Sequence, residues 1–243
     1  MIRFENVSVS YEKATAPVLD SLSFEIGAGE SVGLIGANGA GKSTLLKTLT
    51  GLLPYDGSIT VCDLPLIKEN LAGIRRKTGY VMQNSDNQLF MPKVIDDMVF
   101  GPVNYGESRE NAEKSADEAL AKLGAEYLKE RYNHKISGGE KRLAAIATVL
   151  AMKPEIMLFD EPSSALDPKN RRALISILNS LPETKIIATH DLDLVLDTCE
   201  KVILLNGGRI AAQGKARDIL KDKELLEKNN LELPLSLMPR GEI

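Results

Sequence analysis

The feature that most restricts the fold is a glycine-rich run joining a predicted strand to a predicted helix. Residues 31–36 read SVGLIG, which is typical of a buried strand, and Gly36–Thr44 reads GANGAGKST. An amphipathic stretch with leucines at 45–49 follows. This order matches the pattern G-x-x-x-x-G-K-[ST], in which a loop surrounds the phosphates of a nucleotide. A glycine-rich turn can also simply join a strand to a helix, but that alternative leaves the adjacent Lys42 and Ser43 unexplained.

Each residue type in this loop suits phosphate binding. The three glycines let the backbone curl so that successive N–H groups point at one anion, and the following helix directs its positive end at the same place. Lys42 would supply positive charge to the β- and γ-phosphates, and the Ser43 hydroxyl is placed to bind Mg²⁺. The candidate phosphate-binding residues are Gly36, Ala37, Asn38, Gly39, Ala40, Gly41, Lys42, Ser43 and Thr44.

A second apolar run, Ile156–Pro162, reads IMLFDEP and delivers two carboxylates at the end of a predicted strand. Ligands bind at the carboxyl ends of strands in α/β sheets. Asp160 is suited to hold Mg²⁺, and Glu161 is a candidate general base for an attacking water. Alone, such a run is also typical of a strand end with solvated carboxylates. Downstream of a phosphate loop, it points to nucleotide hydrolysis.

Short apolar runs alternate with helical patterns along the chain, which predicts an α/β fold with a mostly parallel sheet. The predicted strands lie at 2–9, 31–36, 155–160, 185–189 and 201–205, the last opening a hairpin. Apolar residues at 174–181 have helical spacing. In the middle region, one helix is predicted to end near Gly124 and another to begin near Ser137. That region is therefore predicted to be a helical insertion.

The stretch Ile136–Glu155, ISGGEKRLAAIATVLAMKPE, narrows the class of protein. It resembles the signature stretch of ABC ATPases, with Ser137, Gly138, Gly139 and Glu140 in place of the commoner Leu-Ser-Gly-Gly-Gln form. Ser137 is expected to cap a helix whose first turn carries little side-chain bulk, so that a second anion could approach its N–H groups.

Other elements of the ABC family appear in the expected order. Ser164–Asp167 resembles the D-loop, and His190 resembles the switch histidine that contacts the γ-phosphate. Gln83 resembles the Q-loop glutamine that senses Mg²⁺ and the attacking water. Tyr11 matches the aromatic residue that stacks on adenine, although a loop aromatic can also cap a core.

The resemblance implies a P-loop NTPase core of the ABC ATPase type, with an N-terminal antiparallel β subdomain and an inserted helical subdomain. The implied partition is an α/β core with its β subdomain at 1–62 and 153–214, a Q-loop and signature subdomain at 63–152, and a helical tail at 215–243. ATP and Mg²⁺ are the implied cofactors. The implied catalytic residues are Glu161, His190 and Gln83, and the implied metal-binding residues are Ser43, Gln83 and Asp160.

A finer resemblance concerns Val81–Gly106, which is similar to the ATPases of energy-coupling factor importers for metal ions and vitamins. Asp86, Gln88, Leu89 and Phe90 follow the Q-loop glutamine as they do in that group. We expect Leu89 or Phe90 to anchor a partner helix and Asp86 or Gln88 to pair at its rim. Alternatively, the apolar pair is core.

This finer resemblance implies several partners: a second ATPase, identical or paralogous, a transmembrane coupling subunit, and a separate membrane protein that binds the cargo. It places the chain peripherally on the cytoplasmic face of the cell membrane. An ATPase of another ABC importer group is the next alternative.

Net charge, apolar run length and motif content argue against three further classes of protein. The formal net charge of −4 argues against a dedicated nucleic-acid-binding domain, which weakens the alternative of an ABC ATPase acting on DNA or ribosomes; no nucleic-acid partner is expected. No apolar run approaches the roughly 18–20 residues needed to cross a bilayer. A phosphotransfer enzyme with the same loop would leave Ser137–Glu140 and His190 unexplained.

Overall fold

The computed structural model describes residues 1–11 and 16–238. The chain forms two compact units, one made of Met1–Arg75 with Pro182–Ile243 and the other of Arg76–Leu181. Helix α2 (Leu71–Lys77) runs across the boundary between them. The domain partition given by the family resemblance, with 63–152 as the helical part, stays a prediction.

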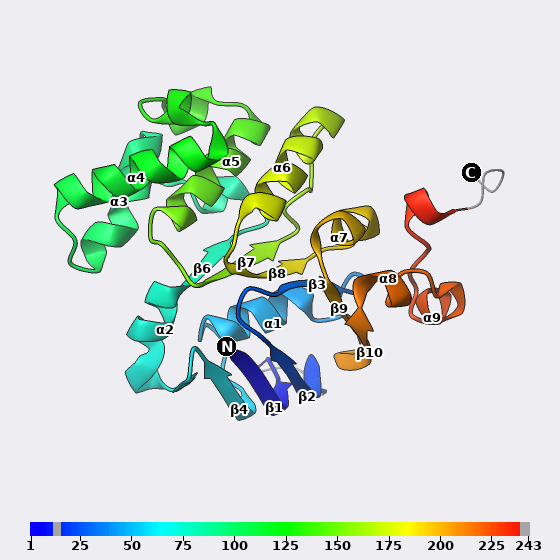
Figure 1. The fold of residues 1–243 in the computed structure, drawn as a ribbon. Coiled ribbons are helices and arrows are strands. Elements are labelled where there is room, and N and C mark those ends of the chain that lie inside the picture. Colours follow the sequence, from blue (N-terminus) through cyan, green and yellow to red (C-terminus); the bar gives the residue numbers. More distant parts are fainter. Residues whose placement is uncertain (12–15, 239–243) are drawn as a thin grey trace. The chain divides into compact units, whose positions relative to one another are not determined.

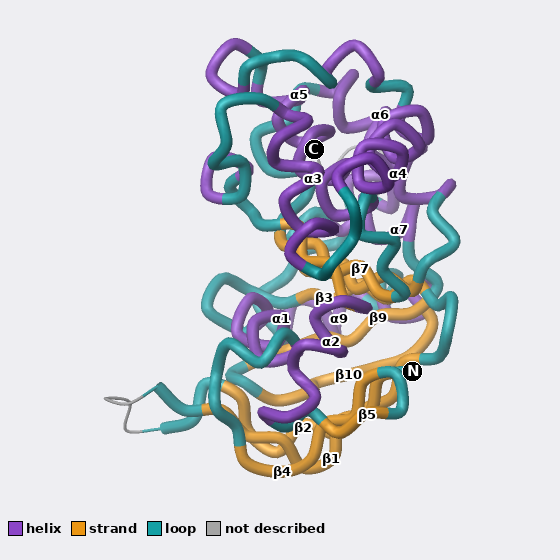
Figure 2. Tube along the Cα trace, turned by 90° about the vertical axis from the view of Figure 1, so that its left-hand side faces the viewer, coloured by secondary structure: helices purple, strands orange, loops and turns teal. Residues whose placement is uncertain are grey.

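The first unit contains an antiparallel sheet in the order β2-β1-β4-β5 (Figure 2). Its strands are β1 (Ile2–Val9), β2 (Leu19–Ile26), β4 (Asp56–Val61) and β5 (Leu64–Pro65). Ile2 and Phe4, then Val7 and Val9, face the core from β1, because successive side chains in a strand point to opposite faces and a register shift between Phe4 and Val7 inserts one extra residue. Phe4 and Phe24 stack across the β1–β2 pair with ring centroids 4.4 Å apart.

This unit also contributes four neighbouring strands, in the order β10-β9-β3-β8, to a six-stranded sheet. Its strands are β3 (Ser31–Ile35), β8 (Thr184–Ala188), β9 (Lys201–Asn206) and β10 (Arg209–Lys215). β3 pairs in parallel with both β8 and β9, and all five of its residues are buried. This explains the unbroken apolar run at this strand, since a central parallel strand is covered on both faces.

The helices of the first unit follow these strands along the chain (Figure 1). They are α1 (Lys42–Leu49), α7 (Leu192–Thr198), α8 (Ala216–Ile219) and α9 (Lys223–Lys228). Ala216, Ile219 and Leu220 join the buried cluster formed by β3, α7 and β9. The segment after β10 is thus packed onto the core of this unit.

The second unit pairs two parallel strands with a group of helices. Its main elements are β6 (Thr78–Val81), α3 (Val94–Asn104), α4 (Arg109–Leu123), α5 (Gly138–Leu150), β7 (Ile156–Asp160) and α6 (Pro168–Ser180). Helices α3, α4 and α5 pack against one another (Figures 1 and 2). Helix α4 begins after Ser108, whose side chain accepts from the Asn111 N–H, and ends at Gly124, which adopts a left-handed φ of 60°. The predicted end near Gly124 and start near Ser137 are both confirmed.

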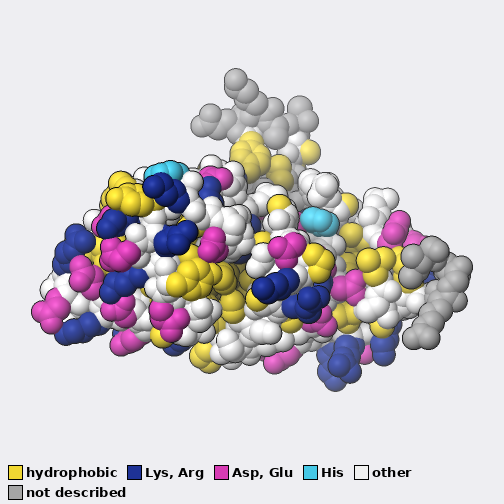
Figure 3. Space-filling view, turned by 90° about the horizontal axis from the view of Figure 1, so that it is seen from above, with side chains coloured by type: hydrophobic (Ala, Val, Ile, Leu, Met, Phe, Trp, Pro, Cys, Tyr) yellow, Lys and Arg dark blue, Asp and Glu magenta, His cyan; other side chains and the backbone are white. Residues whose placement is uncertain are grey.

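The surface carries charges of both signs. On the face shown in Figure 3, Lys and Arg side chains are interspersed with Asp and Glu side chains. None of the described helices is both long and apolar enough to cross a membrane.

Candidate functional site

In the first unit, two neighbouring strands bring the phosphate loop and His190 together. β3 and β8 are parallel, Leu34 is opposite Ala188, and the Thr189 N–H donates to the Leu34 carbonyl at 3.1 Å. Gly36 comes two residues after Leu34, and His190 comes two residues after Ala188. The carboxyl ends of parallel strands meet at one edge of a sheet, so the phosphate loop and the exposed His190 side chain share that edge.

The phosphate loop has the backbone conformation that its glycines allow. Gly36 has a φ of 151°, and a Cβ added there would lie 2.3 Å from the Leu205 carbonyl oxygen. The Lys42 ammonium donates to the carbonyls of Gly36 at 2.7 Å and Ala37 at 3.3 Å. The first turn of α1 contains no acidic residue. A cation and the positive end of a helix therefore lie at one loop, as an anion site requires.

The Tyr11 side chain, just after β1, contacts the start of α1. Its hydroxyl is 3.2 Å from the Thr44 hydroxyl, and 44% of the residue is exposed. This exposure does not fit an aromatic that caps the core. Stacking of the ring on adenine stays a prediction.

In the second unit, β6 and β7 place Gln83 beside the two carboxylates. Val81 is opposite Phe159 in this parallel pair, so Gln83 and Glu161 each lie two residues beyond the register. Asp160 and Glu161 are only 4% and 7% exposed. Glu161 has a φ of 45°, a left-handed conformation that is uncommon for a residue with a side chain. Such conformations gather at functional sites.

Tyr80 is a site residue that the sequence analysis missed. Its hydroxyl donates to Asp160 Oδ2 at 2.9 Å. Burial raises the pKa of Tyr80, and the nearby Asp160 charge raises it further, so the phenol remains a hydrogen-bond donor at neutral pH. One Asp160 oxygen is thereby fixed in orientation. The sequence shows Tyr80 only as one residue of a strand.

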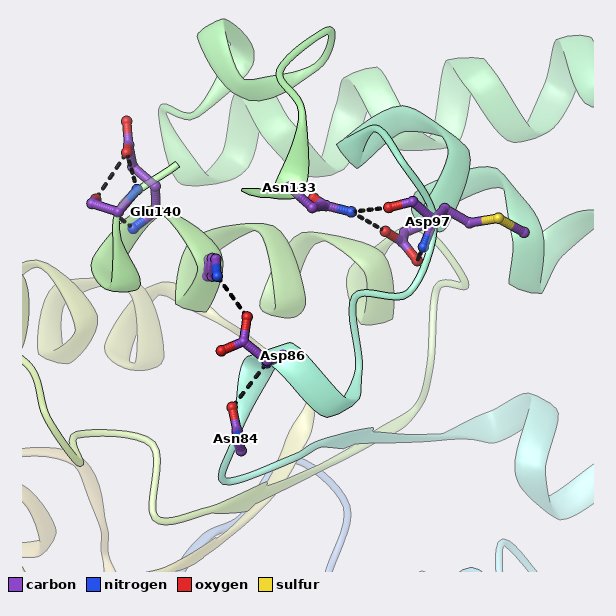
Figure 4. A network of polar contacts seen from close by, with 8 residues as sticks. Asn84, Asp86, Asp97, Asn133 and Glu140 are labelled. Atoms are coloured by element: carbon purple, nitrogen blue, oxygen red, sulfur yellow. Dashed lines mark hydrogen bonds and ion pairs between the residues drawn. The ribbon is translucent and has the colours of Figure 1, made fainter. Parts of the chain in front are cut away.

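The signature helix α5 begins with a capping box at Ser137 and Glu140. Glu140 Oε2 accepts from the Ser137 N–H at 2.7 Å and from the Ser137 hydroxyl at 2.8 Å (Figure 4). These hydrogen bonds lower the pKa of Glu140. Around Gly138, a Cβ would meet nothing within 4 Å. The predicted cap at Ser137 is confirmed, and the first turn of α5 is open on that side.

Helix α5 also holds the Q-loop, through two side chains that the sequence analysis did not assign to this role. Gln88 accepts from the Met82 N–H and donates to the Ala145 carbonyl, and Arg142 donates to the carbonyls of Met82 and Gln83. Burial lowers the pKa of Arg142, and the Asp160 charge acts in the opposite direction. Leu143, the next residue of α5, is only half-buried. The burial of Arg142 could have been predicted from its spacing, because it lies three, four and seven residues before apolar positions of α5 and so on the same helix face.

The segment after Gln83 divides into buried and exposed residues. Leu89 is 7% exposed and Gln88 is tied to α5, so both are removed from the predicted partner surface. Phe90 is 61% exposed. Asp86 pairs with Lys141 at 2.6 Å and points toward α5 in Figure 4, yet 64% of its side chain is exposed.

The D-loop segment is held by local hydrogen bonds. The Asp167 carboxylate caps α6 by accepting from the N–H groups of Lys169 and Asn170, both at 2.9 Å. These bonds lower the pKa of Asp167, with the Asn170 N–H contributing most. Asp167 thus serves at least as a helix cap.

A family model described as ABC transporter matches residues 19–164, more than half of the chain. The chain belongs to the ABC transporter family. A protein of Geobacter sulfurreducens, whose name provisionally assigns it as an ABC transporter ATP-binding protein, is 47% identical over 220 residues, which is 90% of this chain and 88% of the relative. The energy-coupling factor transporter ATP-binding protein EcfA of Methanothermobacter thermautotrophicus is 41% identical over 240 residues, which is 96% of this chain and 77% of EcfA.

Solved structures of ABC ATPases are similar to this chain over most of its length. For cbiO1 from Clostridium perfringens, described as part of the ABC transporter complex cbiONQ, the TM-score is 0.83 at 35% identity, covering 96% of this chain and 95% of cbiO1. For the ATP-binding cassette MJ0796, a dimer in a post-hydrolysis state bound to ADP and Pi, the TM-score is 0.80 at 28% identity, covering 89% of this chain and 99% of that one. The predicted ABC ATPase fold is confirmed. The chain is an ATP-binding, ATP-hydrolysing subunit of an ABC transporter.

Proposed function

We propose that this ABC ATPase energises a multi-subunit membrane importer of the energy-coupling factor type, for metal ions or vitamins. One similar protein, EcfA, is named as an energy-coupling factor transporter ATP-binding protein, and another, cbiO1, is described as part of the ABC transporter complex cbiONQ. The observation that carries the proposal is the exposed aromatic pair Phe90 and Phe100, just after the Q-loop. Their rings meet edge to face with centroids 5.0 Å apart, and the two residues are 61% and 42% exposed.

The roles toward ATP follow from the chemistry of each group. Tyr11 stacks on adenine, and the backbone of Gly36–Thr44 together with Lys42 binds the β- and γ-phosphates. Glu161 accepts a proton from the attacking water, because a carboxylate is the available base at the end of β7. His190 contacts the γ-phosphate from the edge that it shares with the phosphate loop.

Oxygen atoms are the ligands that Mg²⁺ prefers, usually one or two carboxylates together with phosphate oxygens. Asp160 fits this donor set because it is a carboxylate. Its orientation is fixed by the 2.9 Å hydrogen bond from Tyr80 to one of its oxygens. The Ser43 hydroxyl and the Gln83 amide oxygen are further oxygen donors. When bound, Mg²⁺ would neutralise charge that develops on the phosphate oxygens. Each of these three side chains would offer one oxygen ligand to the ion in the proposal.

The active unit is a dimer, formed by two copies or by this chain with a paralogue. The dimeric ABC cassette bound to ADP and Pi supports this arrangement. Ser137–Glu140 faces the nucleotide bound to the phosphate loop of the other subunit, where the N–H groups at the start of α5 can receive the γ-phosphate. ATP closes the dimer, and loss of the γ-phosphate contacts reopens it.

The membrane partner docks on the Phe90–Phe100 pair, and this contact keeps the chain peripherally at the cytoplasmic face. Asp97 holds the backbone at Phe90, because its carboxylate accepts from the N–H groups of Phe90 at 3.0 Å and Met91 at 3.1 Å. Asn133 in turn donates to Asp97 at 2.5 Å (Figure 4). A rigidly held, exposed aromatic residue is typical of an anchor at a protein interface.

The test of this proposal is the substitution Phe90→Ala. We expect the affinity for the transmembrane subunit to fall roughly thirtyfold, because an aromatic anchor contributes about 2 kcal/mol. ATP affinity should stay within about twofold, and unfolding free energy within about 1 kcal/mol, because the side chain is mostly exposed. Binding to the subunit in detergent is measured by calorimetry.

The matched control is Tyr127→Ala, which removes another aromatic residue of the same unit that is 57% exposed. It should leave assembly unchanged. Equal assembly by the Phe90 variant and the wild type would contradict the docking surface. A large loss of stability would show instead that Phe90 belongs to the core.

A further inference from the structure

The side chain of Arg142, on the signature helix α5, contacts the backbone of the Q-loop about 60 residues earlier in the chain. It is only 5% exposed, on the face of α5 that also carries the buried Ala145 and Val149. Its guanidinium donates to the Met82 carbonyl at 2.7 Å and to the Gln83 carbonyl at 2.5 Å. A buried arginine on an apolar helix face is uncommon unless it is paired.

These two carbonyls lie beyond the end of the sheet, where the strand pairing no longer supplies donors. β6 ends at Val81, opposite Phe159, so Met82 and Gln83 lie beyond the parallel pairing with β7. Backbone carbonyls withdrawn from water are almost always hydrogen-bonded. The planar guanidinium presents several N–H groups in a fixed fork, which lets one side chain serve two carbonyls.

The Met82 N–H is also linked to α5, through the side chain of Gln88. Gln88 Oε1 accepts from the Met82 N–H at 3.0 Å, while Gln88 Nε2 donates to the Ala145 carbonyl at 2.7 Å and to the Thr148 hydroxyl at 3.0 Å. The Q-loop backbone is therefore tied to α5 from both sides. Meanwhile the Gln83 side chain is exposed.

Arg142 lies five residues after the cap Ser137, roughly 7.5 Å along the helix axis at 1.5 Å per residue. A continuous helix over Gly138–Leu150 joins the two positions. A helix moves as one body over so short a length, so a displacement of the Gln83 backbone is passed to Ser137–Glu140.

We propose that Arg142 is a positioning residue that ties Gln83 to the signature helix and thereby couples the two ATP sites of the dimer. A displacement of Gln83 after ATP hydrolysis moves Ser137–Glu140, which faces the nucleotide of the other subunit. This inference rests on the proposed function, because it requires the ATP-sandwich dimer.

The test is Arg142→Lys, which keeps the charge but replaces the two-pronged fork by a single ammonium group. We expect kcat for ATP hydrolysis to fall about tenfold or more while KM stays within about twofold, because Gln83 is misplaced and the phosphate loop is untouched. The Hill coefficient for ATP should fall toward about 1. Hydrogen exchange of the amides at 82–84 should become about tenfold faster, because the opening free energy of that segment falls.

The matched control is Lys141→Gln, which removes only the 2.6 Å ion pair to Asp86 of the same loop. It should change kcat by less than about twofold, because exposed ion pairs contribute little. An equal loss in both variants would overturn the assignment to Arg142.

A double-mutant cycle with Gln83→Ala separates positioning from a merely structural role. If Arg142 acts through Gln83, then Arg142→Lys causes no further loss of kcat in the Gln83→Ala background. Additive losses, or a Hill coefficient unchanged from the wild type, would overturn the proposal. If Arg142→Lys does not fold, Arg142→Gln takes its place in the same cycle.

Failure of the proposed function gives a different pattern. In that case the wild type itself shows no ATP-dependent dimer or binds no transmembrane subunit. The inference about Arg142 fails alone when the wild type hydrolyses ATP cooperatively and Arg142→Lys does so equally well.

Discussion

Replacing Glu161 by glutamine is expected to stop ATP turnover while leaving ATP binding intact. Glutamine keeps the size of the side chain and one acceptor oxygen, so the buried position next to Asp160 remains filled. It cannot take a proton from the attacking water. General-base catalysis contributes about 10²- to 10⁴-fold, so kcat measured by phosphate release should fall at least about a hundredfold.

The trapped Glu161→Gln protein should elute as a dimer with ATP and largely as a monomer without it. The matched control is Glu155→Gln, at the residue just before β7, where an ion pair with Lys77 at 2.9 Å is partly exposed. That variant should hydrolyse ATP normally. Unchanged turnover in Glu161→Gln would show that Glu161 is not the base. A dimer that forms equally well without ATP would contradict the ATP-sandwich arrangement.

Replacing Lys42 by alanine should remove most of the affinity for ATP. The ammonium lies at the phosphate loop, 2.7 Å from the Gly36 carbonyl and with only 7% of the residue exposed. Truncating one partner of a buried charge pair costs about 2 to 5 kcal/mol, or roughly thirtyfold to several-thousandfold in Kd. Calorimetry with Mg-ATP measures the change.

The control for this experiment is Lys47→Ala, an exposed lysine in the last turn of α1. Both variants should keep the circular dichroism spectrum of the folded chain, since Lys42 contributes no apolar core. Normal Mg-ATP binding by Lys42→Ala would contradict the assignment of the phosphate loop.

The sequence could predict elements whose local pattern has one physical explanation. The apolar run of β3 followed by glycines and Lys42 is typical of a phosphate-binding loop. Ser137 before a helical pattern is typical of a helix N-cap. Helix α4 was predictable in the same way, because its alanines and leucines recur at helical spacing and Gly124 ends it. These features depend on residues close together in the chain.

The residues that sequence analysis missed act through contacts across long separations. Arg142 and Gln83 are 59 positions apart, and Tyr80 and Asp160 are 80 apart. The acceptors of Arg142 are backbone carbonyls, which leave no mark on residue identity. Leu89 and Phe90 are adjacent and apolar in an irregular segment, so no periodicity shows which one is buried.

The proposed importer function can be tested by isolating the tagged chain from detergent-solubilised membranes of its native cell and identifying the proteins that remain bound. We expect to recover a second ATPase or a second copy of this chain, a transmembrane coupling subunit and a separate cargo-binding membrane protein, in a complex that hydrolyses ATP. Recovery with ribosomes or nucleic acid, and without any membrane protein, would contradict it.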